Sequence, residues 1–140
     1  MIVGCEDNNI IIFKNENIEN EIVESSPVTD LISFGVELFG FALKNGSLGV
    51  SDKKCLKWKY KQKDPIIGIA TYLDEGDYSD ALISGHRTGK IDVRNAETGE
   101  CIFTTNVEQN LSSLFKGNLL QSRDKQIVVA TRSGQIIGYK

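Results

Sequence analysis

The sequence predicts an all-β fold, a partial β-propeller of about three and a half four-stranded antiparallel blades. Short runs rich in Val, Ile, Phe and Tyr alternate with polar turns, and the chain holds 13 glycines and two prolines, which is typical of strands joined by tight turns. A hairpin unit also recurs four times, with 38, 43 and 45 residues between successive turns. A repeat of about 40–45 residues with several strands in each unit is typical of propeller blades.

A first, partial blade is expected over residues 1–26. Its hairpin joins 2–4 to 10–13 through a turn at Asn8, and a further strand is expected over 21–25. Asparagine adopts the left-handed conformation of a tight turn more readily than most residues that carry a side chain. This blade is therefore expected to hold three strands.

A complete blade is expected over residues 27–63. Its turn at Asn45-Gly46 is the strongest short hairpin signal in the chain, because a type I′ turn requires positive φ at both central residues. Pro27 stands before the first strand, where a missing N–H removes no ladder hydrogen bond. The four strands are placed at 28–34, 39–43, 48–50 and 55–60.

A second complete blade is expected over 64–107 and a second partial blade over 108–140. Their hairpins turn at Thr88-Gly89 and Ser133-Gly134, where glycine supplies the left-handed conformation of a short loop. The strands are placed at 66–73, 81–85, 91–93, 100–105, 111–115, 127–130 and 136–139. The expected strand count along the chain is therefore three, four, four and three.

A single domain accounts for the chain, because 140 residues lie within the usual size of one domain. An open arc of blades would leave strand edges unpaired in water. The chain is therefore expected to be part of a longer propeller and to self-associate through its open blade edges. The ring could be closed by the first and last partial blades completing each other, by flanking sequence or by a partner chain. No apolar run approaches the ~20 residues of a membrane-spanning helix, and the first residues lack the pattern of a signal peptide.

A run of alternating lysines is the main candidate for a binding surface. With the period of two of a strand, the lysines line one face and Leu56, Trp58 and Tyr60 line the other. The lysines are Lys57, Lys59, Lys61 and Lys63. They are expected to protect an outermost strand from edge-to-edge aggregation. The alternative is an electrostatic contact with anionic lipid or an acidic partner, whereas the net charge of −3 and the inward aromatic rings disfavour nucleic acid.

Residues with catalytic or metal-binding chemistry are few. One loop is acidic but lacks the register of an EF-hand, so a solvated loop is expected rather than a calcium site; its acids are Asp74, Glu75, Asp77 and Asp80. His86 is the only histidine and is expected at the surface beside its turn. Ser84 and Asp92 complete the residue types of a catalytic triad, but nothing indicates an oxyanion hole. We therefore expect no catalytic residue, no cofactor and no metal.

Several of these segments resemble one known family. The third hairpin carries the most similar pattern, Leu82–Gly85 and Thr88–Arg94 followed by Thr98–Glu100, and the segment Leu43–Val50 with Trp58 adds to it. These segments are similar to the propeller of the Bardet–Biedl syndrome 2 family, and the likeness covers nearly the whole chain. The chain departs from the typical WD40 pattern, because no Trp-Asp dipeptide closes a blade.

The resemblance implies that the chain is the second half of the N-terminal propeller of a BBSome subunit. The BBSome is a coat-like complex that carries membrane proteins into and out of cilia. The implied partners are the other BBSome subunits and ciliary membrane-protein cargo, and the implied locations are the cytoplasm, the cilium, the ciliary base and the ciliary membrane.

The function expected from these observations is that of a non-catalytic protein-interaction scaffold in ciliary membrane-protein trafficking and cilium assembly. Two alternatives remain open. One is a fragment of a propeller enzyme, and the other is a membrane-surface reader that uses the Lys57–Lys63 strand. Any membrane contact is expected to be peripheral at most.

Overall fold

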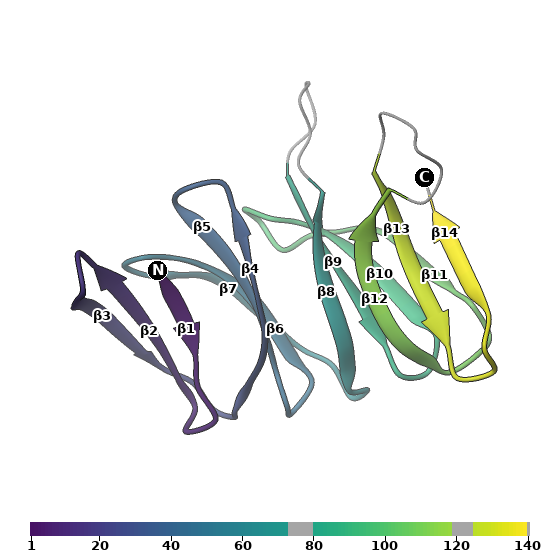
Figure 1. Cartoon of the computed structure of the whole chain (residues 1–140), viewed down its shortest axis with the longest axis horizontal. Helices are drawn as coiled ribbons and strands as arrows, with labels where there is room; N and C mark the ends of the chain where they lie inside the picture. The colour runs from purple at the N-terminus through teal and green to yellow at the C-terminus, as the bar shows by residue number, and fades with distance from the viewer. Residues whose placement is uncertain (73–79, 119–124, 140) are drawn as a thin grey trace.

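A computed structural model describes residues 1–72, 80–118 and 125–139, which form fourteen strands and no helix (Figure 1). The strands make four antiparallel sheets that follow the chain order. Sheet 1 comprises β1 (Ile2–Gly4), β2 (Asn9–Lys14) and β3 (Asn17–Val23), and sheet 2 comprises β4 (Val28–Phe34), β5 (Leu38–Leu43), β6 (Ser47–Asp52) and β7 (Leu56–Lys61). Sheet 3 comprises β8 (Ile66–Tyr72), β9 (Ala81–His86), β10 (Lys90–Asn95) and β11 (Cys101–Asn106), and sheet 4 comprises β12 (Leu111–Gly117), β13 (Gln126–Thr131) and β14 (Ile136–Tyr139).

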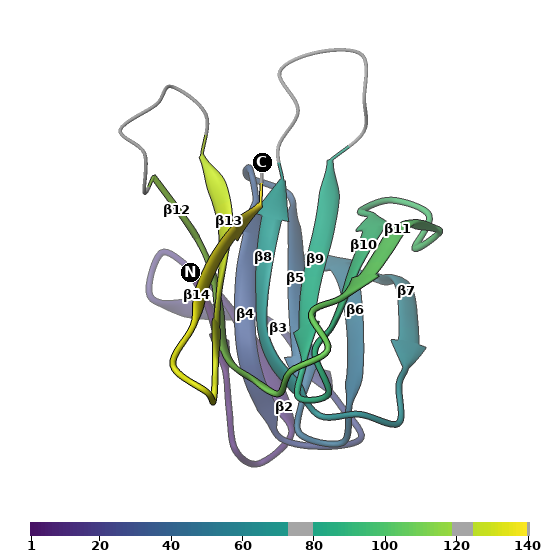
Figure 2. The same cartoon turned by 90° about the vertical axis from the view of Figure 1, so that its right-hand side faces the viewer.

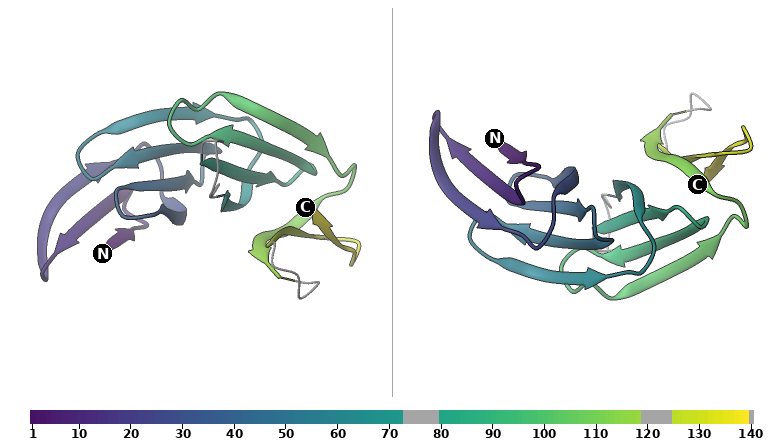
Figure 3. Two further views of the ribbon diagram at one scale, coloured as in Figure 1. Left: turned by 90° about the horizontal axis from the view of Figure 1, so that it is seen from above. Right: turned by 90° about the horizontal axis from the view of Figure 1, so that it is seen from below.

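The sheets follow one another along an arc, as the blades of a propeller do (Figure 3). In sheets 2 and 3 the first strands, β4 and β8, lie on the inner side, and the last strands, β7 and β11, form the outer edges (Figure 2). The predicted all-β partial propeller is confirmed, with three, four, four and three strands in its sheets. The division into blades at residues 26, 63 and 107 stays a prediction.

Three of the hairpins turn in the same way. Gly46, Gly89 and Gly134 have φ angles of 86°, 100° and 91°, the left-handed region that glycine adopts at no steric cost. Each glycine N–H donates a hydrogen bond to the carbonyl three residues earlier, at 3.0, 3.0 and 3.1 Å. This closes a short loop between the two strands, of three residues after β5 and β9 and of four after β13, so glycine at these positions has the role that the sequence predicted.

The prediction of a type I′ turn at Asn45-Gly46 is wrong, because Gly46 has a positive φ but Asn45 does not. Both central residues have positive φ instead at Asn15 (49°) and Glu16 (67°), between β2 and β3, as a type I′ turn requires. This tight turn starts β3 at Asn17, before the expected start at residue 21. Glutamate is an unusual residue for this conformation, which is why the turn was not predicted from the sequence.

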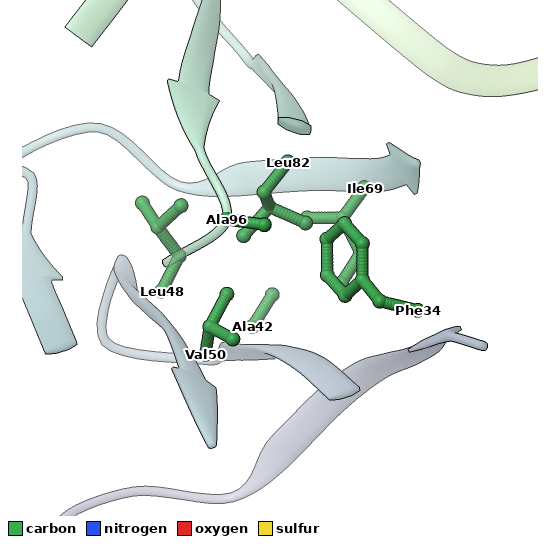
Figure 4. Close-up of a cluster of buried hydrophobic side chains, with 7 residues drawn as sticks. All are labelled: Phe34, Ala42, Leu48, Val50, Ile69, Leu82 and Ala96. Atoms are coloured by element: carbon green, nitrogen blue, oxygen red, sulfur yellow. The ribbon is translucent and has the colours of Figure 1, made fainter. Parts of the chain in front are cut away.

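Apolar side chains fill all three interfaces between neighbouring sheets. Between sheets 1 and 2 they are Ile10, Ile12, Phe39, Phe41 and Leu43. Between sheets 2 and 3 they are Phe34, Ala42, Leu48, Val50, Ile69, Leu82 and Ala96, which Figure 4 shows facing one another. Between sheets 3 and 4 they are Ala70, Ile83, Ile91, Leu111, Leu114 and Val129. Alternate residues of β5 enter the first and second clusters, so this strand is apolar along its whole length rather than in alternation.

Leu82 offers a direct test of this packing, because its side chain is fully buried between sheets 2 and 3. Leu82→Ala is expected to lower the free energy of unfolding by about 2–5 kcal/mol, through lost transfer free energy and a residual cavity. Urea denaturation followed by circular dichroism measures this. Val36→Ala is the matched control, since Val36 is 81% exposed and should change stability by less than about 0.5 kcal/mol. A loss below about 1 kcal/mol for Leu82→Ala would contradict the packing described.

Candidate functional site

Strand β7, which carries the candidate lysines, is the outer edge of sheet 2. Its side chains reach residues of both neighbouring sheets, Glu24 next to sheet 1 on one side and Ala96 of sheet 3 on the other. The strand contains a β-bulge, because Val50 pairs with Trp58 and Ser51 with Leu56, so that Lys57 is the extra residue. A bulge interrupts the alternation of faces, which is why the predicted division into a lysine face and an apolar face is only partly seen.

Two of the four candidate lysines form intramolecular ion pairs. Lys57 Nζ lies 3.3 Å from Asp52 Oδ2 within sheet 2. Lys59 Nζ is paired with the buried carboxylate of Glu24, which follows sheet 1, and also donates to Ser25 Oγ at 3.4 Å. Lys59 therefore joins sheets 1 and 2.

The carboxylate of Asp52 organises the loop before β7. Its Oδ1 accepts hydrogen bonds from the backbone N–H groups of Cys55 and Lys54, both at 2.7 Å. These bonds, with Cys55 the larger cause, hold the pKa of Asp52 far below its ordinary value, because they stabilise the ionised form. Asp52 is thus a fixed anion beside Lys57 at neutral pH.

Lys61 and Lys63 are exposed and take part in none of the ion pairs formed by described residues. Gln62 N–H, between them, donates to the carbonyl of Gly46 at 3.0 Å, which holds this end of β7 against the β5–β6 turn. An electrostatic contact through the lysine strand stays a prediction, and these two lysines are the members that form no ion pair with a described residue.

The aromatic side chains of β7 contact sheet 3. Trp58 Nε1–H donates to the carbonyl of Ala96 at 2.8 Å. Arg94 of β10 lies over the ring of Tyr60, with 3.9 Å between the guanidinium carbon and the ring centroid, and also donates to the carbonyl of Gly99 at 2.9 Å. Such cation–π contacts commonly fix arginine against aromatic residues. Leu56 and Tyr60 are nevertheless about half exposed, at 48% and 45%, so the predicted inward face is only partly buried.

His86, expected at the surface, is fully buried at the end of β9. Its Nε2 lies 3.1 Å from Ser84 Oγ and 3.2 Å from the side-chain nitrogen of Gln62, which follows β7. The expectation was wrong for two reasons. Strand β9 is not at an edge of its sheet, because it lies between β8 and β10. In addition, Gln62 from the neighbouring sheet lies against His86, the last residue of β9.

A buried acid, Asp92 on β10, completes this cluster. Its Oδ2 accepts hydrogen bonds from Gln62 at 2.6 Å and from Lys90 at 2.8 Å, and its Oδ1 accepts one from Thr104 at 2.7 Å. Burial alone would raise the pKa of Asp92, but the hydrogen bonds from Lys90, Thr104 and Gln62 outweigh it and lower the pKa. Asp92 is therefore an anion whose partners come from two sheets.

The arrangement of Ser84, His86 and Asp92 differs from a catalytic triad. A triad places the serine and the acid on opposite nitrogens of the imidazole. Here the hydroxyl of Ser84 lies on Nε2, and Asp92 Oδ2 is nearest to that same nitrogen at 3.8 Å, while the buried Nδ1 accepts or donates no hydrogen bond among the described residues. The cluster connects sheets 2 and 3 rather than presenting a nucleophile.

Three members of the cluster, Gln62, Lys90 and Thr104, were missed by sequence reasoning. Thr104 is close to Asp92 because β10 pairs with β11, and Lys90 is close because it lies two residues before Asp92 on β10; the hairpin pattern predicts both. Gln62 follows the last strand of sheet 2, and it reaches His86 only because sheets 2 and 3 pack against each other. The sequence did contain one signal for a buried polar cluster. Ser84 and His86 are polar residues two positions apart on a strand that was expected to be buried.

The pKa of His86 is lowered from its ordinary value of 6.5. Burial is the main cause; Asp92 and Asp64 oppose it and Lys90 supports it. Because the unfolded chain then binds the proton at higher pH than the folded chain, stability is full above about pH 7 and falls as the pH decreases through 6.5.

We expect the free energy of unfolding to decrease between about pH 7 and 5, with a slope of at most about 1.4 kcal/mol per pH unit, the limit for one proton. Urea denaturation at several pH values measures this. His86→Gln should flatten the slope, and the interpretation is direct because His86 is the only histidine. An unchanged slope in that variant would remove His86 as the titrating group.

Metal and membrane sites can be assessed for the described residues. No group of three or more His, Cys, Asp or Glu side chains among them could hold a metal ion. The predicted solvated loop cannot be placed, because Asp74, Glu75 and Asp77 lie outside the described residues. The part of the chain that the structure describes contains no helix that could span a membrane.

The sequence of this chain matches a family model described as the middle region of ciliary BBSome complex subunit 2, over residues 1–94. The chain belongs to this family. The human BBSome complex member BBS2 is 34% identical over 139 residues, which are 99% of this chain and 19% of that protein. The Caenorhabditis elegans member bbs-2 is 26% identical over 140 residues, 100% of this chain and again 19% of the relative. The chain thus spans about a fifth of the length of these relatives.

Two solved structures have a fold similar to that of this chain. The structure of BBS1N in complex with ARL6DN aligns with a TM-score of 0.82 and 15% identity, covering 98% of this chain and 44% of that one. The computationally designed Ika4 protein aligns with a TM-score of 0.75 and 17% identity, covering 99% of this chain and 82% of that one. At these identities the likeness concerns the fold, and it agrees with the propeller class.

Proposed function

We propose that this chain is a non-catalytic scaffold segment of a BBSome subunit, which acts by binding other BBSome subunits and ciliary membrane-protein cargo. Through these contacts it serves the trafficking of ciliary membrane proteins and cilium assembly, in the cytoplasm, at the ciliary base and at the ciliary membrane. The observation that carries the proposal is the family match over residues 1–94, together with relatives that align over the whole chain.

The geometry of the chain supports a scaffold better than an enzyme. Its buried polar cluster is connected to neighbouring sheets instead of opening to a cleft, and Asp92 uses both of its oxygens for internal hydrogen bonds. Apolar clusters on both faces of sheets 2 and 3 hold the strands in fixed relative positions. Turns and edges held in this way are suited to binding partners by shape, because little order has to be gained on binding.

We also propose that the four sheets are one propeller segment, the second half of the family's propeller, and that open sheet edges let the isolated chain self-associate. Unpaired strand edges are templates for pairing with another chain. The candidate lysine strand, Lys57 to Lys63, is assigned mainly to protection of such an edge, with membrane contact at most peripheral.

Affinity purification of the full-length protein that contains this chain, from ciliated cells that express it, tests the proposal. We expect the other BBSome subunits to co-purify and the tagged protein to localise to the cilium or its base. Leu82→Asp is the matched variant, since a charge in the apolar cluster should unfold this segment and lower recovery of the other subunits. Recovery of well-folded wild-type protein without any BBSome subunit would contradict the proposal.

A further inference from the structure

One end of the molecule carries the same charged feature on three successive sheets. The loops β5–β6, β9–β10 and β13–β14, at the lower edge of the sheets in Figure 1, each begin with a basic residue. These residues are Lys44, Arg87 and Arg132, and all three are exposed. We call them the basic row.

The backbone fixes each member of the basic row in an equivalent place. The N–H groups of Lys44, Arg87 and Arg132 donate to the carbonyls of Pro27, Pro65 and Asn110, at 2.9, 3.0 and 2.8 Å. Each acceptor lies just before the first strand of the same sheet. The repeated bond therefore places the three side chains at the same end of three neighbouring sheets.

The polar side chain next to each basic residue is directed to the preceding loop. Asn45 Nδ2 donates to Ser25 Oγ at 3.3 Å, Thr88 Oγ1 donates to Asp64 Oδ2 at 3.2 Å, and Ser133 Oγ donates to Gln109. These contacts make the turns rigid without using the charges of the basic row. None of the ion pairs formed by described residues involves Lys44, Arg87 or Arg132.

Some other cations of the described residues are neutralised within the chain, because Lys14, Lys53, Lys57, Lys59 and Lys90 each have an acidic partner. The chain as a whole has a net charge of −3. Lys63, which is exposed in the loop beside the Gly46 turn, adds a further cation at the same end. Three turns at one end of an acidic chain thus present positive charges that form no ion pair with the described residues.

We propose that the basic row is a docking surface for an acidic segment of a protein partner. This deepens the proposed scaffold function and rests on it. Arginine forms bidentate hydrogen bonds with carboxylates, and fixed turns reduce the ordering that binding costs. An extended acidic segment can follow the row from sheet to sheet. An extended segment can place its acids beside the basic row and away from Asp64 and Glu108, which lie in the loops before β8 and β12 at this end, whereas a flat anionic membrane would meet these two acids together with the row.

Fluorescence anisotropy with a labelled oligo-glutamate peptide tests the proposal on the purified chain. The variant K44Q/R87Q/R132Q should bind the peptide about tenfold more weakly than wild type, as expected for the loss of three exposed ion pairs. The matched control is K14Q/K53Q/K54Q, which changes the net charge equally in a groove between sheets 1 and 2. It should bind like wild type, and added salt should weaken wild-type binding.

Urea denaturation of both triple variants completes the test, and unchanged stability is expected because the replaced side chains are mostly exposed. Equal weakening in the two variants would show that only net charge matters and would overturn the proposal. Absence of wild-type binding, or binding to vesicles of anionic lipid but not to the peptide, would overturn it as well. These results are independent of BBSome co-purification, so failure of the docking surface is distinguishable from failure of the scaffold function.

Discussion

The structure depends on apolar packing between the faces of neighbouring sheets. Sheets 2 and 3 are covered on both faces, so a side chain on either face of an inner strand is part of an interface. Val50 and Leu82, from different sheets, meet in one cluster and are both fully buried. Fully burying such side chains contributes about 1.5–3 kcal/mol each, compared with about 0.5–1.5 kcal/mol net for a typical hydrogen bond between neutral groups.

Polar contacts at the edges then fix how the sheets lie relative to one another. Lys59 binds Glu24, Trp58 binds the carbonyl of Ala96, and Gln62 connects His86 with Asp92. Hydrogen bonds are directional, unlike apolar burial, so these contacts select one arrangement from those that the apolar clusters allow. A scaffold needs this property, because a partner that contacts several turns requires their spacing to be constant.

The local features of the fold were predictable from the sequence, and the contacts between blades were not. Glycine at positions 46, 89 and 134 indicated the turns because positive φ is a local requirement. The burial of His86 depends on Gln62 of another sheet, and the ion pair of Lys59 depends on Glu24, 35 residues away in the chain. The bulge at Lys57 also has no clear local signal, so the alternation of the lysine strand was predicted as more regular than it is.

Native-state hydrogen exchange is the most direct test of the claim that inter-sheet packing unites the sheets. If sheets 2 and 3 open as one unit, the slowest amides of β5 and β9 share one opening free energy, and Val50→Ala in sheet 2 lowers both by the same amount. If the account is wrong, Val50→Ala accelerates exchange in β5 and β6 and leaves the amides of β9 at their wild-type rates.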